Sequence, residues 1–225
     1  MADLLHKTIF FDLDGTLISL KNRYIKLFQD FLRSPKAQIS SDEYWNLKRL
    51  GKSDYDILSG LNENTLTINI AKRLKHIEDK KYLSLDKLHP HTKKILLSLK
   101  NYKLTLITMR KNVHNLRDEL NNLEINHFFD EVISGKLFDN NQVNGRVVLI
   151  RKANNFSPNF SIFVGDTEVD YKIAERLKIP CVLVTYGLRS VNFLKNNCPN
   201  VQLANSPLEL LKKIKYLEAD RNRQK

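Results

Sequence analysis

Short apolar runs alternate with amphipathic segments along the chain, and the alternation is clearest after about residue 90. Within the amphipathic segments apolar residues recur at helical spacing, as at Leu116, Leu120 and Leu123. Strands that alternate with helices are typical of a parallel sheet covered by helices. We therefore predict an α/β fold with a Rossmann-like parallel sheet at its core. Its core strands are expected at residues 7–13, 103–108, 130–134, 161–165 and 181–185, with a short edge strand near 201–203.

Residues 17–90 follow a different pattern, because they show helical periodicity without a clear strand. Ser40 and Glu43 have the spacing of a capping box, which marks the start of a helix. We expect a helical module at residues 17–90 to be inserted into an α/β core formed by residues 1–16 and 91–225. Candidates for substrate contact lie on this helix, although an aromatic stripe at helical spacing is more often core. They are Tyr44, Trp45, Lys48 and Arg49.

The composition is that of a globular chain. Its 225 residues, 42% of them apolar, suffice for one sizeable core with a smaller module. No apolar run approaches the roughly 18 residues of a membrane span, and Lys7 stands where a signal peptide would need its apolar region. Cys181 and Cys198 lack the spacing of a metal or redox pair. We expect a cytoplasmic monomer or homodimer without membrane contact.

The net charge of +12, from 37 basic and 25 acidic residues, favours anionic ligands. The basic residues are spread along predicted helices, with modest concentrations only at residues 212–215 and 221–225. No aromatic-rich nucleic-acid motif accompanies them. We expect a small phosphorylated substrate, and nucleic acid is the less favoured partner that the charge leaves open.

The run from Ile9 to Leu17 joins an apolar strand to two carboxylates and a glycine. Residues two apart on a strand point to the same side, so Asp12 and Asp14 are expected together at the ligand-binding edge of the sheet. Asp12 can act as the nucleophile that accepts a phosphoryl group. Asp14 can protonate the leaving oxygen and later deprotonate the attacking water. Gly15 permits the tight turn that follows.

A second pair of acids, Asp166 and Asp170, follows the apolar strand predicted at residues 161–165. Mg²⁺ prefers oxygen ligands and needs few protein carboxylates. We predict a magnesium site formed by Asp12, the backbone carbonyl of Asp14, and Asp166. Asp170 is expected as an auxiliary ligand or a supporting acid one helical turn further on.

The strand predicted at residues 103–108 ends in Thr108, Met109 and Arg110. The Thr108 hydroxyl and the adjacent backbone N–H groups, including that of Met109, can bind phosphoryl oxygens without competing as nucleophiles. Arg110 can add positive charge at the same place.

These motifs resemble those of the haloacid dehalogenase superfamily. Asp12 and Asp14 match its first motif, Thr108 its second, and Asp166 with Asp170 its fourth. The resemblance implies that the inserted module is a helical cap of type C1, which closes over the site and selects the substrate. The overall pattern is most similar to phosphoglycolate-phosphatase-like members.

The third motif departs from the family pattern, which has a lysine that pairs with the nucleophilic aspartate and the phosphate. By position this place falls on Arg146, which can bind phosphate bidentately but differs in shape from lysine. Lys136 lies further upstream than usual, and Lys152 lies in the middle of the predicted helix. We favour Arg146 narrowly over Lys136, with Lys152 the weakest candidate.

The predicted function is that of a Mg²⁺-dependent phosphatase acting on a small phosphate monoester through an aspartyl phosphate on Asp12. An aspartate at position 14 disfavours the dehalogenases, which lack it, and the P-type ATPases, which carry threonine. Phosphomutases and phosphonatases stay open as alternatives. A non-catalytic binding protein of the same fold, and a phosphatase of nucleic-acid ends, are further alternatives from other classes.

Overall fold

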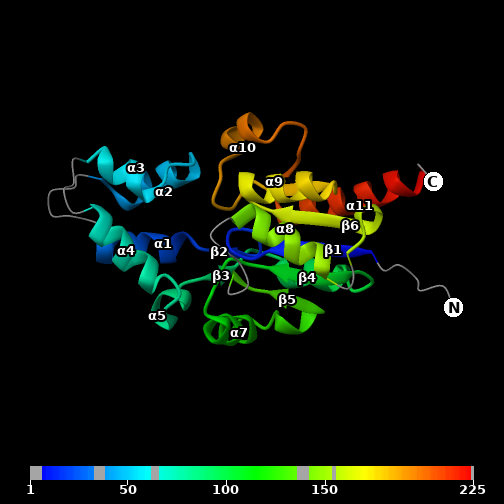
Figure 1. The fold of residues 1–225 in the computed structure, drawn as a ribbon, viewed down its shortest axis with the longest axis horizontal. Helices are drawn as coiled ribbons and strands as arrows, with labels where there is room; N and C mark the ends of the chain where they lie inside the picture. Colours follow the sequence, from blue (N-terminus) through cyan, green and yellow to red (C-terminus); the bar gives the residue numbers. More distant parts are fainter. Residues whose placement is uncertain (1–6, 33–38, 62–65, 136–141, 154–155, 224–225) are drawn as a thin grey trace.

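The computed structural model describes residues 7–32, 39–61, 66–135, 142–153 and 156–223. At its centre is a parallel sheet of strand order β5-β4-β1-β6-β7-β8 (Figure 1). The predicted α/β class is thus confirmed, and each predicted strand is present with ends that shift by at most one residue. The strands are β1 (Thr8–Asp12), β4 (Lys103–Ile107), β5 (Glu131–Ile133), β6 (Ser161–Gly165), β7 (Cys181–Val184) and β8 (Gln202–Ala204).

Helices cover both faces of the sheet, because alternate residues of its strands are buried on opposite sides. Ile9 and Phe11 pack with α6 (Thr92–Ser98), α7 (Val113–Asn122) and α11 (Pro207–Arg223). Phe10 faces the other way and packs with α8 (Gln142–Lys152) and α9 (Glu168–Leu177). The short helix α10 (Val191–Asn197) packs Leu194 against Leu183 of β7. Among the described residues, no helix is both long and apolar enough to cross a membrane.

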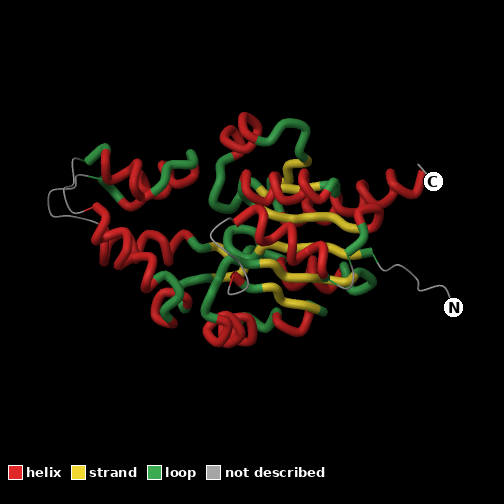
Figure 2. The backbone as a smooth tube through the Cα atoms, in the orientation of Figure 1, coloured by secondary structure: helices red, strands yellow, loops and turns green. Residues whose placement is uncertain are grey.

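A helical lobe, residues Lys21–Leu83, extends from one end of the sheet, opposite the end where α11 lies (Figures 1 and 2). The chain enters it through β2 (Ile18–Ser19) and leaves it through β3 (Lys87–Leu88), which pair antiparallel. The sequence pattern missed these strands because two residues are too few to show an alternation. The lobe comprises α1 (Lys21–Leu27), a π-helical turn (Phe28–Leu32), α2 (Ser41–Arg49), α3 (Asp54–Ser59), α4 (Leu66–His76) and α5 (Lys80–Leu83).

The lobe has its own core around Tyr44, whose ring stacks on Phe28 at a centroid distance of 4.1 Å. Its hydroxyl donates to Asp54, which also pairs with Lys48. Trp45 is buried in the same helix. These side chains therefore stabilise the lobe. Of the two interpretations of the aromatic stripe, substrate contact and core, they fit the second.

The end of α2 docks on the loop that follows β7. Arg49 donates from Nη2 to the carbonyl of Thr185 at 2.6 Å, and the N–H of Ser190 donates to the carbonyl of Arg49 at 2.9 Å. Arg189 donates from Nη1 to the carbonyl of Lys48 at 3.1 Å. The lobe is thus fixed to the core by hydrogen bonds beside the carboxyl ends of the strands.

Candidate active site

Three buried carboxylates meet at the carboxyl edge of the sheet. Asp12 ends β1 and Asp166 follows β6, and these two strands are neighbours in the sheet. Asp170 lies in the first turn of α9, which starts after Asp166. One oxygen from each of the three side chains lies within 4.8 Å of the others. The strand order therefore brings together acids that are more than 150 positions apart in the sequence.

Hydrogen bonds from the backbone hold two of these acids in place. Asp170 Oδ2 accepts from the N–H of Asp166 at 3.2 Å and from the N–H of Thr167 at 3.1 Å, as part of the capping box of α9. The N–H of Leu188 donates to Asp166 Oδ2 at 2.6 Å. The acids are thus positioned by the turns around them before any ligand binds.

Arg146 of α8 is, in the described part of the chain, the cation that pairs with this cluster. Its Nη1 lies 3.0 Å from Asp170 Oδ1 and 3.7 Å from Asp12 Oδ1. The structure therefore places Arg146 where the sequence predicted it, beside the candidate nucleophile. Lys152 is exposed at the end of α8, and Lys136 lies outside the described residues.

The residues present fit a magnesium ion. Asp166 Oδ1 is buried without a hydrogen-bond partner among the described residues, although a buried carboxylate oxygen normally has one. Burial and the neighbouring carboxylates raise the pKa values of Asp12 and Asp166 well above their ordinary range. A Cβ on Gly15 would lie only 2.0 Å from Asp166 Oδ2, so a side chain there would fill the space next to the cluster. Carboxylate oxygens are the donors that Mg²⁺ prefers, and it would relieve their repulsion.

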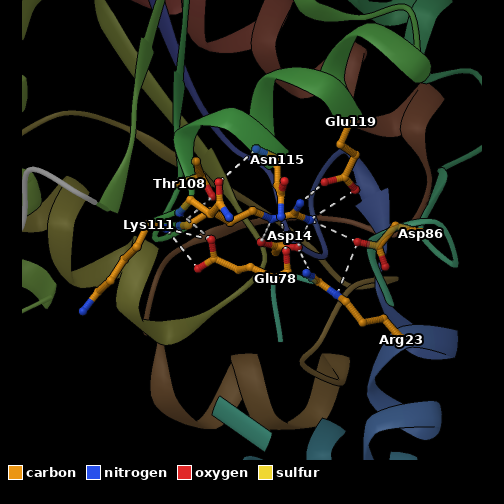
Figure 3. A network of polar contacts seen from close by, with 10 residues as sticks. Asp14, Arg23, Glu78, Asp86, Thr108, Lys111, Asn115 and Glu119 are labelled. Carbon is orange, nitrogen blue, oxygen red and sulfur yellow. Dashed lines mark hydrogen bonds and ion pairs between the residues drawn. The ribbon is translucent and has the colours of Figure 1, made fainter. Parts of the chain in front are cut away.

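The Asp14 carboxylate is held by two arginines (Figure 3). Arg110 binds it with two hydrogen bonds, from Nε to Oδ2 at 2.9 Å and from Nη2 to Oδ1 at 2.8 Å. Arg23, which belongs to α1 of the lobe, also pairs with Asp14. Burial alone would raise the pKa of Asp14, but the two guanidinium groups outweigh it and hold that pKa well below its ordinary value. Asp14 is thus ionised in this arrangement.

Two further acids, Asp86 and Glu119, complete this network around Arg110. Asp86 Oδ2 lies 3.0 Å from Arg110 Nη2 and 3.3 Å from Arg23 Nε. Glu119 of α7 pairs with Arg110 from the other side. Burial, together with the nearby Asp14, raises the pKa of Asp86 to about 7 despite both arginines.

The sequence analysis missed Arg23, Asp86 and Glu119. A signal existed for two of them. Glu119 stands on the buried face of α7 with Leu116 and Leu120, and Arg23 stands on the buried face of α1 with Leu27. A charged residue at an apolar position of an amphipathic helix indicates a buried ion pair.

The candidate phosphate-binding residues lie just after β4. Thr108 is buried, its N–H donates to the carbonyl of Ile133 at 3.0 Å, and its hydroxyl accepts from the N–H of Arg110 at 3.4 Å. Met109, next in the chain, lines the cavity described below, whereas Thr108 is not among its lining residues. A Cβ on Gly135 would lie 2.1 Å from the Met109 carbonyl, so only glycine fits beside this turn.

A cavity of about 360 Å³ opens over the carboxylates, between the sheet edge and the lobe. Asp12, Asp14, Arg146, Asp166 and Asp170 are among the core residues that line it. The lobe contributes Arg23, Tyr24, Leu74, Ile77 and Glu78. Tyr44, Trp45, Lys48 and Arg49, the candidates for substrate contact on α2, do not line this cavity. They pack inside the lobe or dock it on the loop after β7. The lobe residues that face the site come from α1, α4 and the turn after α4.

The family model for haloacid dehalogenase-like hydrolases matches residues 9–184, which is most of the chain. The chain therefore belongs to this family of hydrolases, as its motifs predicted.

Solved structures with a similar fold include a "predicted phosphatase" from Clostridium acetobutylicum, with a TM-score of 0.73 and 24% sequence identity. The match covers 94% of this chain and 99% of that one. A haloacid dehalogenase-like family hydrolase from Streptococcus pneumoniae has a TM-score of 0.69 and 23% identity, with coverage of 93% and 98%. A "predicted phosphoglycolate phosphatase" from Haemophilus somnus has a TM-score of 0.67 and 22% identity, with coverage of 95% and 100%. No curated protein matches the sequence.

Proposed function

We propose that this protein is a Mg²⁺-dependent phosphatase that hydrolyses a small phosphate monoester through an aspartyl phosphate on Asp12. The observation that carries the proposal is the position of Asp12. Its carboxylate lies at the floor of the cavity beside Arg146 and two further acids, one of which has a buried oxygen without a partner. A cavity that gathers these carboxylates beside Arg146 is suited to a bound cation and a phosphoryl group.

In the first step Asp12 attacks the phosphorus atom, and the bond to the leaving oxygen breaks. Arg146 binds a phosphoryl oxygen, and the N–H of Met109, which follows β4, donates to another. Asp12, Asp166 and Asp170 would hold Mg²⁺, which supplies positive charge that offsets repulsion between the carboxylate and the phosphate dianion. The products of this step are the aspartyl phosphate and the alcohol.

In the second step Asp14 takes a proton from water, which hydrolyses the aspartyl phosphate. The ionised state of Asp14 suits this role, because a general base must be free of its proton. In the first step Asp14 donates a proton to the leaving oxygen, and it can carry that proton only if Arg23 or Arg110 releases it when substrate enters, so that its pKa rises. We propose that the lobe is the cap that brings Arg23 to this position, with the core formed by residues 1–16 and 91–225.

The described cysteines, Cys181 and Cys198, are free thiols. Free thiols accord with the reducing cytoplasm, and a cytoplasmic location forms part of the proposal. The +12 charge adds a general attraction for a phosphorylated substrate.

Release of phosphate from a panel of small phosphate esters, in Mg²⁺ and in EDTA, tests the proposal. Turnover that needs Mg²⁺ and disappears in Asp12→Asn, with an unchanged circular dichroism spectrum, is the expected result. Turnover that persists in Asp12→Asn would remove Asp12 as the nucleophile. A folded wild-type protein that releases no phosphate across the panel would favour a phosphomutase or a binding protein of this fold instead.

A further inference from the structure

The cavity has two chemically different walls. Its floor carries the carboxylates and arginines of the proposed reaction. Three of the five lining residues that the lobe contributes are apolar or aromatic, namely Tyr24, Leu74 and Ile77, and the core adds Met109, Val169 and Leu188. A phosphoryl group bound at the floor therefore directs the rest of the substrate against an apolar wall.

Leu74 is the most exposed member of this wall, with 56% of its surface accessible to solvent. It lies in α4, near the end of the helix that leads to Ile77 and Glu78. A ligand that covers this exposed leucine removes apolar surface from water, which favours binding. The Glu78 carboxylate on the same side of the cavity is held by the N–H groups of Lys111 and Asn112, and its negative charge disfavours an anionic leaving group.

The arginines that line the cavity are already paired with acids. Among the described residues, Arg23 and Arg110 bind Asp14, and Arg146 binds Asp170. Arg189 pairs with Glu168 through two hydrogen bonds, at 2.8 and 2.9 Å. In the proposed reaction Arg146 binds the phosphoryl group, so a second negative charge on the substrate would have to compete with Asp14 or Glu168 for one of the other three arginines.

Two more cations lie behind the ring of Tyr24 and not in the cavity. The Arg73 guanidinium packs 4.6 Å from the ring centroid, and Lys48 Nζ lies 5.8 Å from it. Both pair with Asp54 inside the lobe, and neither lines the cavity. The Tyr24 ring thus separates them from the substrate.

We propose that the leaving group of the substrate is uncharged and largely apolar, and that Leu74, Ile77 and Tyr24 determine this specificity. The inference rests on the proposed phosphatase function and narrows its substrate class. A leaving group that carries a carboxylate or a second phosphate would lose its hydration in the cavity without meeting an unpaired cation among the described residues, so the site disfavours it. This separates the chain from phosphatases that select small dianionic metabolites.

The test compares kcat/KM for 4-carbamoylphenyl phosphate and 4-carboxyphenyl phosphate, which differ in one neutral or charged group of nearly equal size. The wild type should prefer the neutral ester by at least about tenfold. Leu74→Lys places a cation at the mouth and should reduce this preference to about threefold or less. Leu97→Lys is the matched control, because Leu97 is 60% exposed and lies in α6, which does not line the cavity. It should keep the wild-type preference.

Equal or faster turnover of the carboxylated ester by the wild type would overturn the inference and leave the phosphatase proposal intact. An unchanged preference in Leu74→Lys would remove Leu74 as a specificity determinant. Failure of the wild type to hydrolyse either ester, or any other phosphate ester in Mg²⁺, would instead overturn the phosphatase proposal and the inference with it.

Discussion

Replacing Asp166 with asparagine should stabilise the protein in the absence of metal and remove its stabilisation by Mg²⁺. The reason is electrostatic, since the three clustered carboxylates repel one another when no cation lies between them. Burial and neighbouring acids raise the folded pKa values of Asp12 and Asp166 above the ordinary 3.8. Asparagine keeps the size of the side chain and an oxygen that can accept from Leu188, and it removes the charge.

The magnitude follows from the distances. Two carboxylates no more than 4.8 Å apart repel by at least about 3.5 kcal/mol at an effective dielectric constant of about 20, and Arg146 offsets part of this. We expect Asp166→Asn to raise the free energy of unfolding without metal by about 1–3 kcal/mol. For the wild type, Mg²⁺ at 100 times its dissociation constant should add about 2.7 kcal/mol. The variant should gain little from Mg²⁺, because the unpartnered carboxylate oxygen is gone.

The sign of the pH dependence is set by the same shifts. An acid with a raised folded pKa binds its proton more tightly in the folded state, so stability falls as pH rises from about 4 to the folded pKa. The full loss of stability is present above the folded pKa, and acidification reverses it. Asp86, with a pKa raised to about 7, titrates in the same range. The difference between wild type and Asp166→Asn isolates the contribution of the cluster, because Asp86 is common to both.

Urea unfolding at pH 8, with EDTA or with MgCl₂, measures these quantities. Circular dichroism follows the whole chain, and fluorescence of Trp45, the single tryptophan, follows the helical lobe. Asp118→Asn is the matched control, because Asp118 is more exposed and pairs with Lys80. The control should respond to Mg²⁺ as the wild type does. A loss of stability in metal-free Asp166→Asn, or an intact Mg²⁺ effect in that variant, would refute the reasoning.

Three further predictions concern catalysis. Asp12→Asn should reduce Mg²⁺-dependent phosphate release to background while the circular dichroism spectrum stays unchanged. Arg146→Gln should lower kcat/KM by about 100-fold, and Arg146→Lys by less, since a lysine keeps the charge without the bidentate geometry; steady-state kinetics distinguish the two. Arg110→Gln should raise the pKa of Asp14 and move the acidic limb of the kcat/KM profile to higher pH. The same variant should lose about 3–5 kcal/mol of stability in urea unfolding, because it leaves buried carboxylates without their cation.

The sheet could be predicted from the sequence because buried parallel strands are continuous apolar runs with polar residues at their carboxyl ends. Asp12 and Asp166 mark the ends of neighbouring strands in this way, and the strand order brings them together without any further information. The short strands β2 and β3 carried no such signal. Their two residues each are paired through contacts between chain segments almost 70 positions apart.

The arginine network could not be predicted to the same extent. Asp14 was recognised from its spacing to Asp12, but its partner Arg23 comes from the lobe and its partner Arg110 is itself bound by Glu119 of α7, and only folding shows that these residues meet. The sequence left the role of α2 open between substrate contact and core for a related reason. An aromatic and basic helix looks the same in sequence whether it faces a substrate, packs a core or docks on a neighbouring loop, as Arg49 does at Thr185.

The position of the network in the chain couples the lobe to the chemistry. Arg23 follows β2, where the chain enters the lobe, and Asp86 precedes β3, where it returns. Asp86 binds the Arg110 guanidinium that also holds Asp14, and Arg23 pairs with both Asp14 and Asp86. A rotation of the lobe about these two strands must therefore change the contacts of Asp14, and with them the proton affinity of the proposed acid and base. A phosphoryl group that draws Arg23 away from Asp14 would therefore shift the lobe and raise the proton affinity of Asp14 at the same time.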